Sequence, residues 1–303
     1  MAALSCIGLG CAPIGNLFSA VSEEQAVATV DAAWNAGVRL FDTAPQYGHG
    51  LSEQRLGRAL ARRPRDQFVL SSKVGRLLRA VSPRPPSSFA DIGELDPVFD
   101  FSRDGVLRSI DESLERLGMD RLDIVHVHDP DDHEADALSD AFPALIELRD
   151  QGVIGAVGCG MNQTAMLTRF VERVDLDVIL VAGRWTLLDQ QAGETLLPLC
   201  LEHGVDVIVG GVFNSGLLAN PSAGATFDYA AAPTPLVARA QAMADRCAAA
   251  GVSLRSAAIA FARTQPAVTT VLVGARSPSE ITDNVTASAV PIPPGLLGEL
   301  LLL

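Results

Sequence analysis

The 303-residue sequence has no long apolar run, no leader-like start and no paired cysteine motif. Its apolar residues make up 48% of the chain, but they are dispersed, and no run of them is long enough to cross a bilayer. The first residues, MAALSCIGLG, lack a basic stretch followed by a long apolar segment, so we expect no secretory signal. The five cysteines form no CxxC motif and are odd in number, which favours reduced, mostly buried thiols. These absences predict a soluble cytoplasmic protein without a membrane partner.

Positive charge is also scarce, with 23 basic against 36 acidic residues and a formal net charge of −13. Such a chain repels a nucleic-acid backbone unless a local basic patch overrides the overall charge, and the sequence contains no basic run. We therefore expect no nucleic-acid partner. No apolar stripe stands apart from the patterns of ordinary helices, so the sequence makes no prediction of oligomeric state.

A unit of amphipathic helix, glycine and short apolar strand recurs along the chain. The unit occurs at 34–42, 148–158 and 200–210, with the sequences WNAG-VRLFD, LRDQG-VIGAVG and CLEHG-VDVIVG. A glycine after the last helical turn can end the helix in the left-handed conformation, and the β-branched run that follows is typical of a buried parallel strand. Further strand candidates lie at 6–10, 68–72, 122–128, 177–181 and 270–274. Helical patterns separate the eight strands; one at 22–36 has Ser22 as a candidate cap.

Eight alternating strand–helix units are compatible with a closed barrel or with an open, doubly wound sheet. Polar residues of catalytic type follow several different strands, as the active face of a barrel requires, whereas an open sheet gathers its ligands at one switch point. The segment GLGCAPIG at 8–15 also lacks the GxGxxG spacing. We therefore predict a single (β/α)8 TIM-barrel domain over residues 1–303. The segments 74–102 and 211–235 are too long for simple connectors, which favours binding loops or a lid.

Asp42, Tyr47, Lys73 and His128 lie at or just after the ends of the second, third and fourth predicted strands. A tyrosine phenol has a pKa near ~10, so it needs a nearby cation to exchange protons near neutral pH. Lys73 can supply that cation, Asp42 can hold it in place, and His128 can donate a hydrogen bond to a substrate oxygen. Each residue alone has a plain structural interpretation as a loop tyrosine, a surface charge or a cap. Their combination at three successive strand ends predicts an acid–base site.

Four segments resemble the aldo-keto reductase superfamily: FDTAPQYGHGLSEQRLG at 41–57, LSSKVGR at 70–76, DESLERLGMDRLDIVHVHDP at 111–130 and VLVGARSPSEITDNV at 271–285. The resemblance implies a catalytic tetrad of Asp42, Tyr47, Lys73 and His128, hydride transfer at the nicotinamide C4, and no metal. AGRWTLLDQ at 182–190 and GGVFNSGLLA at 210–219 are similar to one branch of that superfamily. This branch contains L-fucose or D-threo-aldose 1-dehydrogenases, L-galactose dehydrogenase and pyridoxal 4-dehydrogenase.

The resemblance also implies a cofactor site after the fifth, seventh and eighth strands. Its expected members are Asn162, Phe213, Asn214, Ser215, Gly216, Leu217, Gly274, Ala275, Arg276, Glu280 and Asn284. The chain departs from the pattern at CGMNQ, where Asn162 alone stands for a Ser-Asn pair, and at Ala182 and Gly210, which replace a glutamine and a stacking aromatic. Phe213 or Trp185 is the candidate for that stacking role.

The cofactor preference expected from the resemblance is NAD. NADP-preferring relatives carry a lysine and an arginine where this chain has Gly274 and Glu280, and a carboxylate repels a 2′-phosphate but accepts hydrogen bonds from a 2′-hydroxyl. Arg276 lies four residues from Glu280 and leaves NADP possible.

The expected substrate is a small sugar or aldehyde. Gln46, His49, Trp185 and the 74–102 loop are expected to line a pocket whose polarity fits a polyol. The expected reaction is oxidation of an aldose such as L-fucose or L-galactose at C1 to the lactone. Pyridoxal 4-dehydrogenation, or general reduction of aldehydes and ketones with NADPH, is the alternative.

Two other classes of protein are alternatives to an oxidoreductase. His126 and His128 lie two apart on one strand, a spacing also found in metal sites. A metal hydrolase needs ligands from other strand ends, and His49, His133 and His203 fall in loops or a helix, so we predict no metal and interpret His126 as a buried, hydrogen-bonded histidine. A sensor that binds the cofactor without turnover is disfavoured by the complete tetrad.

Overall fold

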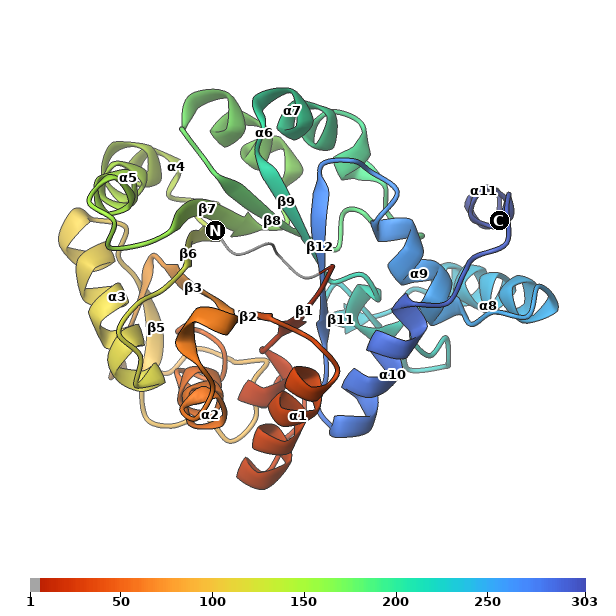
Figure 1. Cartoon of the computed structure of the whole chain (residues 1–303), viewed down its shortest axis with the longest axis horizontal. Coiled ribbons are helices and arrows are strands. Elements are labelled where there is room, and N and C mark those ends of the chain that lie inside the picture. Colours follow the sequence, from red (N-terminus) through yellow and green to blue (C-terminus); the bar gives the residue numbers. More distant parts are fainter. Residues whose placement is uncertain (1–5) are drawn as a thin grey trace.

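Eight parallel strands close into a barrel in the computed structural model, which describes residues 6–303 (Figure 1). The strands are β1 (Ile7–Gly10), β2 (Leu40–Asp42), β3 (Val69–Val74), β6 (Ile124–His128), β7 (Ala156–Met161), β8 (Val178–Ala182), β9 (Asp206–Gly210) and β12 (Val268–Gly274). They follow one another around the ring in chain order, and β12 pairs with β1 to close it. Each predicted strand segment supplies one of these strands. The predicted (β/α)8 barrel is therefore confirmed.

Helices surround the barrel and connect its strands (Figure 1). They are α1 (Glu23–Asn35), α2 (Leu51–Leu60), α3 (Arg103–Leu117), α5 (Phe142–Asp150), α6 (Thr164–Arg173), α7 (Leu196–His203), α9 (Leu254–Ala262) and α10 (Pro278–Ser288). The shorter α4 (Glu134–Asp136) precedes α5, α8 (Thr234–Ala249) packs beside α9, and α11 (Leu296–Leu301) packs beside α8. Ser22 caps α1 as predicted, because its hydroxyl accepts a hydrogen bond from Gln25 N at 3.2 Å. No helix within residues 6–303 is long and apolar enough to cross a membrane.

The apolar core has two layers, one inside the barrel and one between strands and helices. The inner layer is built from residues at the start or in the middle of the strands, namely Leu40, Val69, Ile124, Ala156, Val178, Leu180 and Ile208, together with Leu272, which lies later in β12. These side chains fill the amino-terminal half of the barrel and give it a closed floor. Polar side chains inside the barrel therefore lie toward its carboxyl end, which is the active face of such barrels. We call the carboxyl ends of the strands and the loops after them the mouth.

Both long segments lie at the mouth and form small hairpins rather than plain loops. Within 74–102, β4 (Arg76–Arg79) pairs with β5 (Asp96–Phe99), and within 211–235, β10 (Thr226–Phe227) pairs with β11 (Ala230–Ala231). The first segment also reaches the loop after β1, because Phe18 N donates to Ser88 O at 2.9 Å. The second reaches the same loop through ring contact of Tyr229 with Phe18, at 5.9 Å between centroids. Three loops thus meet beside the mouth.

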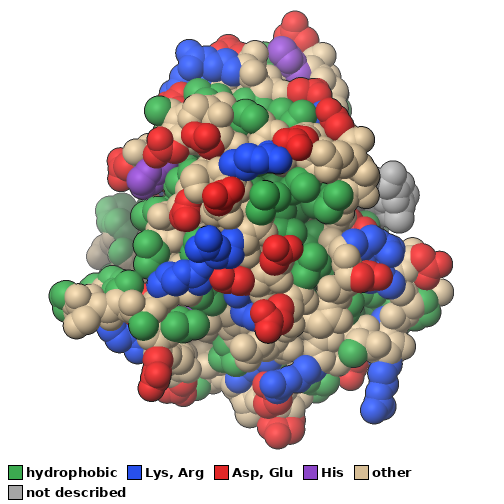
Figure 2. Space-filling view, turned by 90° about the vertical axis from the view of Figure 1, so that its left-hand side faces the viewer, with side chains coloured by type: hydrophobic (Ala, Val, Ile, Leu, Met, Phe, Trp, Pro, Cys, Tyr) green, Lys and Arg blue, Asp and Glu red, His purple; other side chains and the backbone are tan. Residues whose placement is uncertain are grey.

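The face that carries α3 and α5 shows acidic and basic side chains interspersed (Figure 2). Several are paired: Arg103 of α3 with Glu147 of α5 at 2.6 Å, and Arg149 with Asp175 at 2.7 Å. Exposed pairs of this kind contribute little each to stability. Their effect is a face without an extended area of one charge.

Gly57 sets the spacing between α2 and α3. A Cβ at this position would overlap the carbonyl oxygen of Leu117, at the end of α3. A Gly→Ala change inside a helix normally stabilises by about 1 kcal/mol. Here the clash with a backbone atom destabilises the fold and outweighs that gain. We therefore expect Gly57→Ala to lower the free energy of unfolding by about 1–3 kcal/mol, as measured by urea unfolding.

Gly298 in α11 is the matched control, since a Cβ there meets nothing within 4 Å. Gly298→Ala should leave the free energy of unfolding unchanged or slightly raised. Equal stability of the two variants would contradict the role assigned to Gly57.

Candidate active site

The register of neighbouring strands places the predicted catalytic residues on one interior surface. Asp42 pairs with Ser71 across β2 and β3, and Lys73 pairs with His126 across β3 and β6. Because alternate residues of a strand point the same way, Ser71 and Lys73 share the interior side of β3, and His126 and His128 share that of β6. Asp42, Lys73 and His128 therefore meet at the carboxyl ends of three adjacent strands.

Tyr47 is positioned by the loop between β2 and α2. Its carbonyl oxygen accepts the Ser52 N–H at 3.1 Å, at the start of α2. A Cβ on Gly48 would overlap the Gly15 carbonyl, and one on Gly15 would lie 2.9 Å from the Tyr47 carbonyl carbon. The two glycines let the loops after β1 and β2 touch backbone to backbone. This contact fixes the height of Tyr47 above the barrel.

Lys73, the only lysine in the sequence, is held by two oxygen atoms, and the carboxylate that supplies one of them is itself hydrogen-bonded. Its Nζ lies 2.7 Å from Asp42 Oδ2 and donates to Thr43 O at 2.8 Å, while Asp42 Oδ1 accepts from Ser71 Oγ at 2.8 Å. Asp42 and Lys73 are each 2% exposed. A buried ammonium requires such pairing, since burial of an unpaired charge is very costly. The fixed Nζ lies 4.7 Å from the centroid of the Tyr47 ring.

Tyr47 and His128 complete the group. Their rings meet edge to face, with 5.9 Å between centroids. Burial raises the pKa of Tyr47 well above its usual value, Asp42 raises it further, and Arg76 is the cation that opposes this rise. Burial lowers the pKa of His128, and the charges of Arg76 and Lys73 lower it further. The resting site therefore holds a protonated phenol and a neutral imidazole, which are a proton donor and a hydrogen-bond donor for one oxygen atom.

Sequence reasoning missed two charged residues beside this group. Arg76 Nη2 lies 3.1 Å from Asp129 Oδ2, and the same carboxylate oxygen lies 3.4 Å from His128 Nε2. Both residues are inside segments that resemble the superfamily, yet neither belongs to the tetrad that the resemblance implies. Their positions after β3 and β6, adjacent to catalytic candidates, are the signal that would have found them.

The three predicted substrate residues lie in different surroundings. His49 holds the 74–102 segment, since its Nδ1 lies 2.7 Å from Leu95 O and its Nε2 lies 3.2 Å from Ser87 Oγ. Gln46 is half-buried next to Tyr47. Trp185 packs against Phe261 of α9, at 4.8 Å between ring centroids, and belongs to the layer between strands and helices. These contacts give a substrate or stacking role of Trp185 no support.

The predicted cofactor residues gather at the ends of β7, β9 and β12. Asn162 follows β7 and is half-buried. After β9, Asn214, Ser215 and Gly216 have consecutive positive φ angles of 46°, 56° and 106°, beside the partly buried Phe213 and the fully buried Leu217. The Asn214 amide donates to Gly183 O at 3.4 Å, and its buried Oδ1 has no hydrogen-bond partner within residues 6–303.

The end of β12 leads into α10 through a tightly bonded turn. The Glu280 carboxylate accepts the Arg276 backbone N–H at 2.7 Å and its guanidinium at 3.0 Å, and Ser277 caps α10. Although burial acts in the opposite direction, the hydrogen bonds from Arg276 lower the pKa of Glu280. Asn284 donates to Gly274 O at 3.2 Å and accepts from Arg255, a cation outside the predicted cofactor residues. Ala275 is buried in this turn.

These residues fit a nicotinamide dinucleotide. The carboxamide of the nicotinamide could bind the unpaired amide oxygen of Asn214 and the half-buried amide of Asn162. A phosphate of the dinucleotide could bind at the capped amino terminus of α10. Arg255 and Arg276 add positive charge near the same turn. When bound, the nicotinamide supplies the hydride-accepting or hydride-donating carbon.

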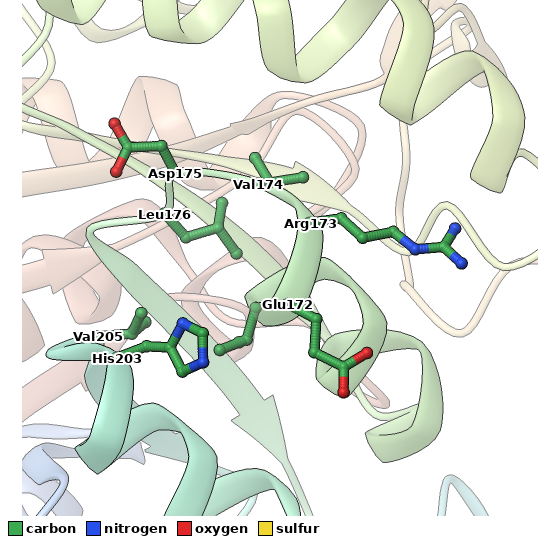
Figure 3. A pocket seen from close by; sticks show the side chains of 8 residues that line it. Glu172, Arg173, Val174, Asp175, Leu176, His203 and Val205 are labelled. Atoms are coloured by element: carbon green, nitrogen blue, oxygen red, sulfur yellow. The ribbon is translucent and has the colours of Figure 1, made fainter.

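A separate cavity of about 290 Å³ lies at the other end of the barrel (Figure 3). Its lining comes from the end of α6, the turn into β8, and the turn between α7 and β9, and includes Glu172, Asp175 and His203. This is the amino-terminal face, whereas the active sites of such barrels lie at the carboxyl-terminal face. The cavity is thus remote from the tetrad.

His126 is buried beneath Lys73, as predicted. Its ring makes no well-formed hydrogen bond within residues 6–303, and the backbone of Cys159 offers it only a weak one. The ring occupies the space left by Gly158, where a Cβ would overlap Nδ1. Burial and the Lys73 charge lower its pKa to about 3. Across residues 6–303, no three His, Cys, Asp or Glu side chains gather as a possible metal site.

The family model described as aldo/keto reductase matches residues 6–298, and the chain belongs to the aldo/keto reductase family. It is accordingly an NAD(P)-dependent oxidoreductase. The chain is 45% identical to a D-threo-aldose 1-dehydrogenase of Pseudomonas sp, over 98% of this chain and 93% of that protein. It is 41% identical to a pyridoxal 4-dehydrogenase of Microbacterium luteolum, over 93% and 89%. A solved aldo-keto reductase of Bacillus halodurans, in its holo form, superposes with a TM-score of 0.78 at 25% identity, over 98% and 92%.

The neutral state of His126 makes stability depend on pH. An unfolded chain protonates this histidine near pH 6.5, and the folded protein only near pH 3, so the unfolded state binds more protons between these values. The contribution of neutral His126 to the free energy of unfolding is fully present above pH 6.5 and is lost as the pH drops toward 3. We expect His126→Leu to reduce this slope by up to about 1.4 kcal/mol per pH unit in chemical unfolding between pH 4 and 6.

At pH 8 the variant should be at least as stable as the wild type, because leucine leaves no unpaired ring nitrogen. His203, exposed on α7, is the control, and His203→Gln should keep the wild-type slope. An unchanged slope in His126→Leu would show that His126 does not cause the pH dependence.

Proposed function

We propose that the enzyme oxidises the C1 hydroxyl of a cyclic aldose to a lactone and transfers the hydride to NAD. The observation that carries the proposal is the buried Asp42–Lys73 pair beside Tyr47 and His128, at a mouth that also presents Arg76 and Asp129. So many charged and hydrogen-bonding groups at the mouth can bind the hydroxyls of a polyol, whereas an apolar ketone would leave most of them without a partner. The name of the Pseudomonas relative, D-threo-aldose 1-dehydrogenase, supports a sugar substrate.

The proposed oxidation removes a proton and a hydride from the same C–OH group. His128 Nε2–H binds the hydroxyl oxygen and orients it. The Tyr47 oxygen, as phenolate, takes the hydroxyl proton, while the C1–H electron pair leaves as hydride and the C=O bond forms. Lys73 stabilises the phenolate, and Asp42 keeps Lys73 in place. Because the resting phenol is protonated, oxidation is favoured at high pH and the reverse reduction at low pH.

Tyr47→Phe tests this assignment directly. Without the phenolic oxygen, proton transfer is lost while the ring keeps its contacts, so kcat for aldose oxidation should fall by about 10²-fold or more. Cofactor binding, measured by fluorescence titration, should change little. A variant with near wild-type turnover would refute the role of Tyr47.

The substrate class is tested in the same assay with L-fucose, L-galactose, D-arabinose and pyridoxal, each with NAD and with NADP. We expect an aldose to give the highest kcat/KM. Pyridoxal is the second candidate, because Phe89 lies 6.1 Å from the Tyr47 ring and offers an aromatic surface at the mouth. A preference for pyridoxal over all three sugars would replace the aldose proposal.

The preference for NAD is proposed to rest on Glu280. Its charged carboxylate lies in the turn after β12 and opposes a 2′-phosphate, while Arg276 and Arg255 nearby reduce that effect. We expect the wild type to have the higher kcat/KM with NAD, and Glu280→Arg to shift the ratio toward NADP by about tenfold or more.

Asp283→Arg makes the same change of charge on an exposed position of α10 and is the matched control. It should leave the ratio close to that of the wild type. An NADP preference in the wild type, or an equal shift in both variants, would exclude Glu280 as the selector.

A further inference from the structure

Arg76 and Asp129 form an ion pair that faces the catalytic histidine. Arg76 begins β4, directly after the catalytic strand β3, and Asp129 follows His128 at the end of β6. The carboxylate oxygen Oδ2 of Asp129 is shared, at 3.1 Å from Arg76 Nη2 and 3.4 Å from His128 Nε2. The pair is thus placed beside the nitrogen that would bind the reacting oxygen.

The backbone of Asp129 is in a conformation that side chains rarely adopt. Its φ is +42°, in the left-handed region, where aspartate and asparagine are the most tolerated residues other than glycine. A hydrogen bond from Asp129 N to Gly160 O, at 3.1 Å, holds it there. Left-handed residues at active sites are commonly strained conformations that the surrounding structure maintains. Here the conformation directs the carboxylate toward His128 and Arg76.

Both members of the pair have unused hydrogen-bonding capacity. Arg76 is 9% exposed, and its buried Nη1 has no partner within residues 6–303. Buried polar atoms of this kind are uncommon in folded proteins unless water or a ligand satisfies them. The Asp129 side chain is 34% exposed, and its 3.4 Å distance to His128 Nε2 exceeds that of a charge-assisted hydrogen bond. Arg76 therefore has an unsatisfied donor, and the Asp129 carboxylate is accessible to a molecule in the mouth.

We propose that Arg76 and Asp129 recognise the substrate hydroxyl on the carbon next to the reacting one, which is C2 of an aldose. This inference deepens the proposed function and rests on it. A hydroxyl has one donor and two acceptor positions, so it can donate to Asp129 and accept from Arg76 Nη1. His128 Nε2 binds the oxygen on C1, and the adjacent carboxylate meets the next oxygen along the sugar.

A purely structural role for the pair makes a different prediction. Arg76 also lies over the Phe99 ring, 4.9 Å from its centroid, and so ties β4 to β5. If the pair served only to hold this hairpin, its loss would lower stability or activity equally for every substrate. Recognition of a hydroxyl instead requires that the loss depend on whether the substrate carries that hydroxyl.

The test compares D-arabinose with 2-deoxy-D-ribose, which differs from it only by lacking the C2 hydroxyl. We expect wild-type kcat/KM to be about ten- to hundredfold higher for D-arabinose, the effect of one hydrogen bond to a charged group. Asp129→Asn should lower kcat/KM for D-arabinose by about tenfold, mainly through KM, and change that for 2-deoxy-D-ribose by less than about threefold. Asparagine tolerates the left-handed backbone, so this variant keeps the local fold.

Arg76→Lys is the second variant, because it keeps the charge and removes the guanidinium fork. It should reduce the discrimination between the two sugars as Asp129→Asn does. Arg79→Gln is the control: Arg79 is in the same hairpin and pairs with Glu112 of α3 at 2.9 Å, and its loss should leave the discrimination unchanged. Equal loss for both sugars in Asp129→Asn, or discrimination unaltered in both variants, would overturn the proposal.

A second pair of substrates distinguishes a wrong recognition pair from a wrong proposal of aldose oxidation. If the wild type oxidises none of the aldoses, the same variants are tested by reduction of lactaldehyde and propanal with NADH, which differ by a hydroxyl next to the aldehyde carbon. A preference for lactaldehyde that Asp129→Asn removes supports the recognition pair without an aldose. Equal rates for the two aldehydes in the wild type would overturn it.

Discussion

The Asp42 carboxylate lies 2.7 Å from the Lys73 ammonium, and each residue is 2% exposed. Neither charge is tolerable at this depth without the other, because removal of one partner leaves a buried, uncompensated ion. The pair bridges β2 and β3 inside the barrel, and the carbonyl of Thr43 and the hydroxyl of Ser71 complete its hydrogen bonds. It therefore requires both strands to keep their register, and that register in turn places the catalytic groups. Lys73 is the one lysine of the sequence, and all the other Lys or Arg side chains are arginines.

Burial, and after it the nearby cations, keep the neighbouring histidines neutral. Burial and the Lys73 charge lower the pKa of His126, and burial, Arg76 and Lys73 lower that of His128. His128 can therefore act as a neutral hydrogen-bond donor over the pH range in which free histidine titrates. The charges of Asp42 and Arg76 both act on Tyr47: Asp42 raises its pKa and Arg76 lowers it. The acid–base state of the site is thus a property of the whole cluster, and no single residue determines it.

The sequence was sufficient for the barrel because its local signals agree. Six of the eight barrel strands end in a polar or small residue, and each repeated unit ends its helix at a glycine, such as Gly152 and Gly204, which do adopt positive φ. The tetrad positions followed from the strand ends, and its geometry then follows from parallel register. Interactions between distant loops carry no such periodic signal. The carboxylate of Asp129 next to His128 Nε2, or Arg255 bonded to Asn284, depends on loop conformations that only the folded chain defines.

The difference between strand ends and loops also separates the residues proposed for catalysis from those proposed to select the substrate. The groups proposed for acid–base catalysis are on strand ends, or are tied to them through Gly15 and Gly48, so they cannot move without disturbing the barrel. Phe89 lies in the long loop after β3, and Arg76 and Asp129 lie where the catalytic strands pass into loops, which tolerate sequence change far better than strands do. His49 fixes one of these loops with both ring nitrogens, which gives the mouth a defined shape. Changes in these loops can therefore alter the substrate while the buried ion pair, and with it the hydride-transfer chemistry, remains as it is.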